Sequence, residues 1–173
     1  MPSKKIILAF IIFWGFFSLS GCEFNWRRYS SKEYGFSLLL PANWEEVEER
    51  KTVIMLRASR DNATDRFQET INVVVTEFPT DILLSTFFEL NKEELLRVFP
   101  AAFNIMESNI FAGRVFGKLL TFDGRVEDTV LRVLTACWIK NKRAYVVTCV
   151  AEVKNFPKYS RLFKKVLGSM RIH

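Results

Sequence analysis

Histidine is almost absent from this sequence of 173 residues, and its scarcity excludes several kinds of catalytic site. The single histidine is His173, the last residue. Neither a Ser-His-Asp nor a Cys-His arrangement can therefore form inside a pocket, unless the tail inserts there. The motifs HExxH, CxxC, GxSxG and GxxxxGKS or GxxxxGKT do not occur. We expect a domain without enzymatic activity and without a cofactor.

Paired carboxylates are present, but solvation explains them better than chemistry. Glu45-Glu46 and Glu48-Glu49 directly precede Arg50-Lys51. Adjacent acids of this kind are far more often a solvated turn than the two carboxylates of a glycosidase. Asp61 and Asp65 lie in a polar loop and supply too few oxygens for calcium, which takes about six to eight. No metal site is predicted, and a small hydrolase is the least favoured function.

The longest apolar run, Ile6 to Phe17, is too short to cross a membrane, since a spanning helix needs about 20 apolar residues. Lys4 and Lys5 precede it, which is typical of a secretion signal. Leu19-Ser20-Gly21-Cys22 follows and resembles the lipobox of bacterial lipoprotein precursors, in which the cysteine is modified. We therefore expect residues 1–21 to be a signal peptide and Cys22 to carry lipid. The alternative is an uncleaved membrane helix.

The lipobox resemblance implies where the protein is found. Such cysteines carry several acyl chains, palmitate among them, and stable anchoring requires more than one chain. We expect an exported protein that is lipid-anchored to a bacterial membrane through Cys22, at the cell surface or in the periplasm. Residue 23 is Glu and not Asp, which favours the outer membrane if the host has one.

Removal of residues 1–21 would leave a chain that suits one domain with one core. Residues 22–33 are expected to form a tether, and residues 34–173 the domain. Charge is uneven along it, because residues 22–100 carry 10 Lys and Arg against 14 Asp and Glu, whereas residues 101–173 carry 13 against 5. A basic face could meet anionic lipid head groups or an acidic partner, or could simply be solvated. Nucleic acid is not expected as a partner outside the cytoplasm.

The domain shows strand and helix patterns in alternating groups. Helical periodicity covers residues 82–98 and 156–170, and Asn91-Lys92-Glu93-Glu94 resembles a capping box that would start a second short helix. Turns are expected at Gly113, Asp123-Gly124 and Asn141-Lys142. Groups of strands followed by helices predict an α+β fold with an antiparallel sheet. Strands are expected at residues 34–41, 52–58, 70–78, 104–111, 114–122, 129–139 and 144–151, the second and third as a hairpin.

The C-terminal helix is amphipathic, with apolar residues at spacings of three and four. Four basic residues fall on its other face, which is a candidate contact face for lipid or for a protein partner: Lys158, Arg161, Lys164 and Lys165.

Cys137 and Cys149 could be oxidised in an exported domain. A two-residue turn at Asn141-Lys142 makes the numbers of paired residues sum to 283, so that Cys137 lies opposite Val146 and Cys149 opposite Leu134. The two thiols then point to opposite faces of the sheet. Two buried free thiols are favoured, because a disulfide would need a register near 286 and a longer loop.

Four segments carry a resemblance to a known family. They are Tyr34-Gly35-Phe36-Ser37-Leu38 with Pro41 and Trp44, Ala112-Gly113-Arg114-Val115-Phe116, Tyr145-Val146-Val147-Thr148, and Phe163 to Ile172. Together they resemble the PsbP-like and DcrB-like domains of photosystem II extrinsic proteins and of many bacterial lipoproteins. The resemblance implies an α/β sandwich, with an antiparallel sheet flanked by helices, and an accessory or binding role.

We therefore expect a membrane-anchored lipoprotein whose domain is a non-enzymatic accessory or binding module. It would dock onto an envelope or membrane-associated complex. The alternative is a structural, envelope-maintaining lipoprotein that contacts lipid through its basic C-terminal helix.

Overall fold

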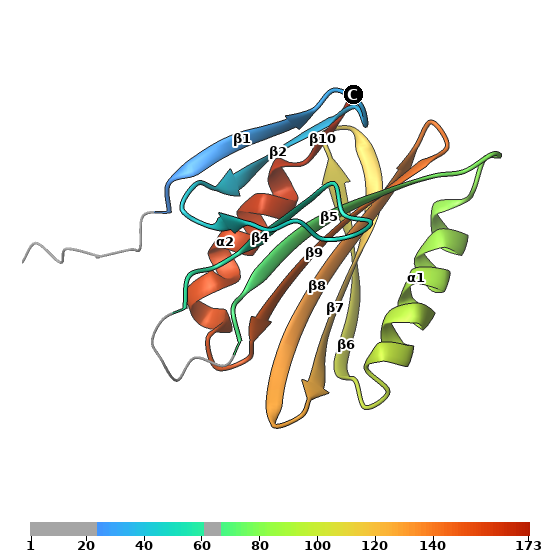
Figure 1. Cartoon of the computed structure of the whole chain (residues 1–173). Coiled ribbons are helices and arrows are strands. Elements are labelled where there is room, and N and C mark those ends of the chain that lie inside the picture. The colour runs from blue at the N-terminus through green and yellow to red at the C-terminus, as the bar shows by residue number, and fades with distance from the viewer. Residues whose placement is uncertain (1–23, 61–66) are drawn as a thin grey trace, which may run out of the picture.

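A seven-stranded antiparallel sheet dominates the computed structural model, which describes residues 24–60 and 67–173 (Figure 1). The predicted signal peptide, Cys22, Asp61 and Asp65 lie outside the described residues. The strand order is β3-β4-β5-β9-β8-β7-β6. The bounds are β3 (Glu45–Glu46), β4 (Ile54–Arg57), β5 (Thr70–Glu77), β6 (Phe103–Ala112), β7 (Val115–Val126), β8 (Thr129–Lys140) and β9 (Arg143–Glu152).

Consecutive hairpins build the half of the sheet from β6 to β9. Asn141 and Lys142 both have positive φ, 52° and 58°, which a two-residue turn of the I′ type requires. The predicted register is confirmed, because Cys137 pairs with Val146 and Lys140 with Arg143. The predicted hairpin between residues 52–58 and 70–78 is also confirmed, as β4 pairs antiparallel with β5.

The turn predicted at Asp123-Gly124 is wrong, because β7 continues through both residues to Val126. Asp123 is buried there and accepts hydrogen bonds from Arg132 on β8. Gly124 lies so close to the ring of Phe99 that no Cβ would fit. An ion pair and an aromatic ring therefore hold two turn-forming residue types inside a strand.

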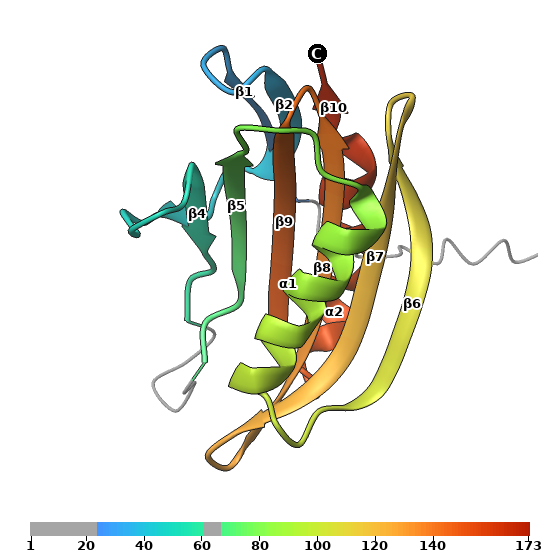
Figure 2. The same ribbon diagram turned by 90° about the vertical axis from the view of Figure 1, so that its right-hand side faces the viewer.

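Helices cover both faces of the sheet, as Figure 2 shows. Helix α1 (Leu84–Val98) packs against β7 and β8, whereas α2 (Phe156–Ser169) packs against β6 and β9 on the other face. The second short helix predicted from the capping box is wrong, since Asn91 lies in the middle of α1. No helix within the described part of the chain is long and apolar enough to cross a membrane.

A small second sheet packs beside α2 and contains β1 (Trp26–Ser31), β2 (Phe36–Pro41) and β10 (Arg171–Ile172). The tether predicted for residues 22–33 is wrong from Trp26 onward, because β1 pairs with β2 along its whole length. The physical reason is that the rings of Trp26 and Tyr29 pack against the core.

Each face of the main sheet has its own apolar core. The larger core lies on the α2 side and includes Phe36, Trp138 and Phe163, all fully buried. The smaller core lies under α1 and includes Phe88 and Phe122. Because both cores are complete within residues 24–173, this stretch is expected to fold as a unit.

Candidate functional site

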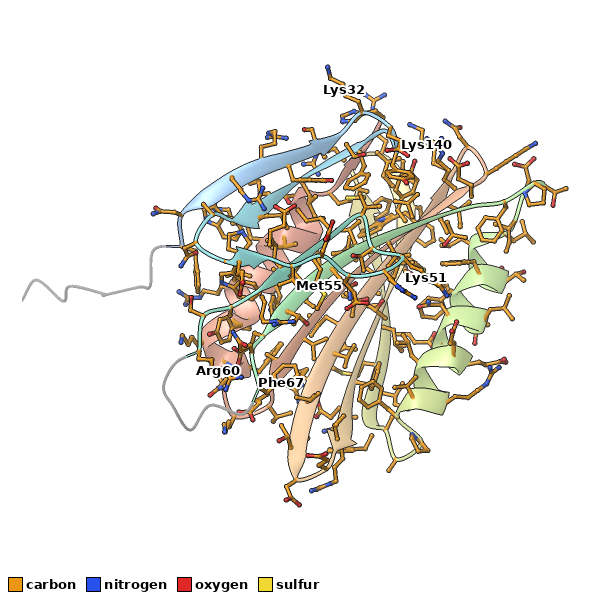
Figure 3. The ribbon with its side chains drawn as sticks, viewed as in Figure 1. Lys32, Lys51, Met55, Arg60, Phe67 and Lys140 are labelled. Atoms are coloured by element: carbon orange, nitrogen blue, oxygen red, sulfur yellow. The ribbon has the colours of Figure 1, made fainter. Side chains whose placement is uncertain are left out.

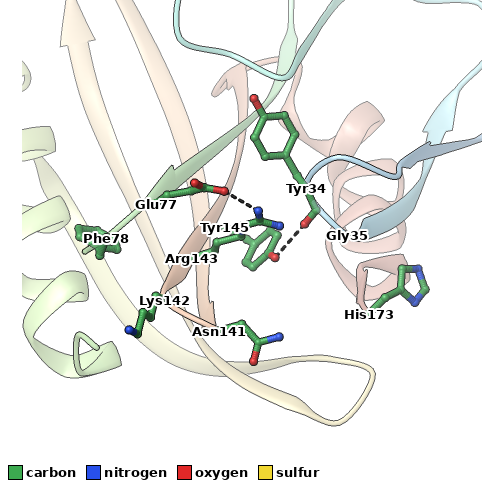
Figure 4. Close-up of a pocket in the computed structure, with 9 residues that line it drawn as sticks. All are labelled: Tyr34, Gly35, Glu77, Phe78, Asn141, Lys142, Arg143, Tyr145 and His173. Atoms are coloured by element: carbon green, nitrogen blue, oxygen red, sulfur yellow. Dashed lines mark hydrogen bonds and ion pairs between the residues drawn. The ribbon is translucent and has the colours of Figure 1, made fainter. Parts of the chain in front are cut away.

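A polar pocket of about 400 Å³ opens at the end of the sheet where β8 turns into β9 (Figure 4). Four separate parts of the chain form it: the turn before β2, the end of β5, the β8–β9 turn with the start of β9, and His173 after β10. Its lining residues are Tyr34, Gly35, Glu77, Phe78, Asn141, Lys142, Arg143, Tyr145 and His173.

Three of the polar side chains in this pocket, those of Glu77, Arg143 and Tyr145, are held by hydrogen bonds or an ion pair. Nη2 of Arg143 lies 2.5 Å from Oε1 of Glu77, and the carboxylate raises the pKa of Arg143. Nη1 of Arg143 donates to the backbone carbonyl of Glu33 at 3.2 Å. The hydroxyl of Tyr145 donates to the backbone carbonyl of Tyr34 at 2.9 Å. Burial raises the pKa of the Tyr145 hydroxyl. The contacts fix the shape of the pocket and engage the side chains of Glu77, Arg143 and Tyr145.

His173 is tied into the structure beside this pocket. Its backbone N–H donates to the carbonyl of Gly35 at 2.8 Å, and its ring Nε2 lies 3.3 Å from Oγ of Ser37. The tail does bring a histidine next to a serine, but Ser37 is only 4% exposed. A substrate could not reach its hydroxyl, so this pair does not form a nucleophilic site.

The acidic residues singled out in the sequence do not form a site in the described structure. Glu45 and Glu46 form the exposed edge strand β3 and not a turn, and Glu46 pairs with Arg27 at 2.7 Å. Within residues 24–60 and 67–173, no group of three or more His, Cys, Asp and Glu side chains is placed to hold a metal ion.

Cys137 and Cys149 are buried free thiols. Cys137 belongs to the core under α1 and Cys149 to the core under α2. The alternative of a disulfide is wrong, because the observed register places the two side chains on opposite faces of the sheet. Burial raises the pKa of Cys137 to about 11 and also raises the pKa of Cys149, so both thiols are protonated at neutral pH.

The four basic residues of α2 are exposed on its outer face, as the periodicity predicted, and we call them the α2 basic face: Lys158, Arg161, Lys164 and Lys165. Nζ of Lys165 lies 4.2 Å from the centroid of the Trp26 ring. This contact places the α2 basic face next to the first residues of β1.

Strand β6 is the edge of the main sheet, and its backbone has no partner on one side among the described residues. Phe103, Ile105, Met106 and Phe111 on this strand are between 43% and 62% exposed. We call these four residues the β6 apolar edge. Sequence reasoning predicted the strand but not its exposure, because apolar residues on both faces of a strand usually indicate a buried one.

The sequence matches no family model and no curated protein. The structure is similar to the solution structure of cyanobacterial PsbP (CyanoP) from Synechocystis, with a TM-score of 0.66, 18% identity, and coverage of 86% of this chain and 92% of that one. This is a Mog1/PsbP-like fold. The predicted α+β class and PsbP-like architecture are therefore confirmed.

Two further solved structures share the Mog1/PsbP-like fold. LpqN of Mycobacterium tuberculosis has a TM-score of 0.62 at 11% identity, with 86% of this chain and 90% of that chain covered. The Ran-binding protein Mog1p of Saccharomyces cerevisiae has a TM-score of 0.59 at 11% identity, with 87% and 96% covered. At these identities the likeness shows the fold and no shared site.

Proposed function

We propose that this protein is an exported lipoprotein, anchored through Cys22, whose domain is a non-enzymatic binding module for an envelope or membrane-associated protein complex. The β6 apolar edge is the observation that supports the docking part of this proposal. Soluble proteins usually protect an edge strand with lysines, prolines or short length. Strand β6 has 10 residues and, after one register shift between Phe103 and Met106, pairs regularly with β7 from Met106 to Ala112. Its single charged residue, Glu107, is paired with Lys92 at 2.8 Å. Such an edge suits an extended partner segment that adds a strand.

Two proteins of similar fold support a binding role. Mog1p is a Ran-binding protein, and LpqN is involved in cell envelope biogenesis. The first is a precedent for a protein partner, and the second for a role in the envelope.

The docking proposal is tested by cross-linking and co-purification of the tagged full-length protein from membranes. In the double variant Ile105→Lys with Phe111→Lys, two ammonium groups stand on the β6 apolar edge, where a docked strand would bury them. We expect the wild type to enrich one protein or complex and this variant to lose it. The matched control is Val98→Lys with Val126→Lys, which adds the same two charges at exposed apolar residues outside β6 and should keep the partner.

Anchoring is measured separately, by mass spectrometry of the mature N-terminus. We expect acyl chains on Cys22, and we expect Cys22→Ser to release the protein from membranes. An unmodified cysteine would contradict anchoring, whereas equal capture by wild type and the double variant would contradict docking through β6.

The contact between Lys165 and Trp26 favours a second function, a structural lipoprotein that contacts lipid through the α2 basic face. Trp26 follows Cys22 by four residues, and four residues span at most about 14 Å. Acyl chains on Cys22 would therefore hold the α2 basic face near the head groups. Each basic residue near an anionic surface contributes about 1 kcal/mol to binding.

This second function is tested with residues 24–173 and vesicles that contain anionic lipid. Reversal of all four charges of the α2 basic face should abolish binding. The matched control reverses Lys32 and Lys51, which lie away from α2 (Figure 3), together with the exposed Arg125 and Lys142. Equal loss in both variants would indicate attraction by net charge alone and would contradict a specific face.

A further inference from the structure

An apolar groove of about 320 Å³ lies between α2 and strands β6, β7 and β8. It is separate from the polar pocket and shares none of its residues. Its apolar walls come from three strands and from one side of the helix: Met106, Ile110, Leu119, Leu134, Phe156 and Leu167.

Helix α2 contributes a glycine, Gly168, to the lining of the groove and so places no side chain there. A Cβ added to Gly168 would meet no atom within 4 Å. The φ of Gly168 does not lie in the left-handed region, so the backbone does not require glycine at this position. Glycine inside a helix lowers its stability relative to alanine. Met106, which also lines the groove, is 62% exposed. The groove is therefore open between Gly168 and Met106, two of the residues that line it.

The charged side chains that line the described groove are both basic, Arg132 and Lys164. Arg132 is already paired with Asp123, at 2.7 Å from Nε to Oδ1. Lys164 is exposed and forms no ion pair with any residue that the structure describes. The groove thus combines an apolar wall with one free positive charge at its rim. This charge pattern complements a molecule with an apolar body and a negative end.

We propose that the groove binds a medium-chain fatty acid, with the acyl chain against the apolar wall and the carboxylate at Lys164. The volume lies at the lower end of the range of about 300–1,000 Å³ for ligand sites, which suits one unbranched chain. An extended protein segment in the groove would place backbone N–H and C=O groups against this apolar wall, where they would lack hydrogen-bond partners. A single acyl chain has no such groups.

The head-group contact is tested by calorimetric titration of residues 24–173 with decanoate and with decanol, which has the same chain and no charge. Lys164→Glu should weaken decanoate binding at least about tenfold and leave decanol binding nearly unchanged. Arg161→Glu is the matched control, because it makes the same charge change on α2 outside the groove. We expect less than a twofold effect from it.

The wall is tested by filling the groove. Gly168→Leu places a side chain in the open space and should abolish binding of both compounds, whereas Gly168→Ala should keep most of it. Both variants should fold, because each replaces a helical glycine with a better helix former. Absence of decanoate binding, wild-type binding by Gly168→Leu, or equal losses in Lys164→Glu and Arg161→Glu would each overturn the proposal. None of these results depends on Cys22 or on strand β6 as a docking edge.

Discussion

Asp123→Asn removes one negative charge from the β7–β8 hairpin while it keeps the size and shape of the side chain. In the wild type the carboxylate is 2% exposed and accepts two hydrogen bonds from Arg132, at 2.7 and 2.8 Å. It accepts a third from Nδ2 of Asn104 at 2.8 Å. In the variant only one oxygen remains as an acceptor. The new NH₂ group is itself a donor, so it cannot accept a hydrogen bond from the Arg132 or Asn104 donor that it faces.

The expected cost follows from these three contacts. Hydrogen bonds to a charged group contribute about 1.5–3 kcal/mol each, and bonds between neutral groups about 0.5–1.5 kcal/mol. The variant loses at least one hydrogen bond to a charged carboxylate. The remaining hydrogen bonds weaken because their acceptor is now neutral. Arg132 is 29% exposed and stays partly hydrated, so the cost should not exceed the range of about 3–5 kcal/mol for a fully buried pair. We expect the free energy of unfolding to fall by about 2–4 kcal/mol.

The same ion pair predicts how stability depends on pH. The hydrogen bonds from Arg132 are the main cause that holds the pKa of Asp123 below its ordinary value of 3.8. Because the folded pKa is lower than the unfolded one, the stabilisation is fully present above about pH 4 and is lost as the pH falls through the folded pKa. The difference in the free energy of unfolding between the wild type and Asp123→Asn should therefore have its full value at pH 7 and be smaller at pH 3.

Urea unfolding of residues 24–173 at the two pH values measures both effects. Asp128→Asn changes a carboxylate that is exposed at the turn of the same hairpin, and it should change the stability by less than about 0.5 kcal/mol. The reasoning is refuted if Asp123→Asn costs no more than this control, or if its effect grows as the pH falls.

Two further predictions concern the interior of the sheet. Gly117→Ala should lower the free energy of unfolding by about 2–3 kcal/mol, because its Cβ would lie 2.5 Å from the carbonyl oxygen of Cys137 and would press on the ring of Trp138. A urea midpoint equal to that of the wild type would show that the strand can move aside. Cys137 and Cys149 should not react with a thiol reagent such as DTNB in the folded protein at pH 8, since burial raises both pKa values, and should react fully in urea. Fast reaction of either thiol in the folded state would contradict the described packing.

Much of the fold could be predicted, because the strands of the second half carry local signals. The β8–β9 register followed from Asn141-Lys142 alone, since a two-residue turn leaves one pairing. Local signals failed where distant residues decide the outcome. Asp123 resembles a turn residue until Arg132 is placed beside it, and Trp26 resembles part of a tether until the core that receives its ring is known.

The candidate surfaces could be predicted only in part. The α2 basic face follows from helical periodicity within one segment. The β6 apolar edge does not, because strand order determines which strand is last, and strand order is not visible in a local pattern. The groove requires residues of β6, β7, β8 and α2 together, so no single segment reveals it.

The pairing of β5 with β9 has a consequence for synthesis of the chain. Its ladder joins strands about 70 residues apart, and such distant pairing forms late because a long loop must close first. The hairpins made before then are marginally stable alone, and α2, which seals the larger core, comes after β9. The larger core therefore cannot close until α2 has left the ribosome. Late closure of this core would suit the export that we propose for the protein.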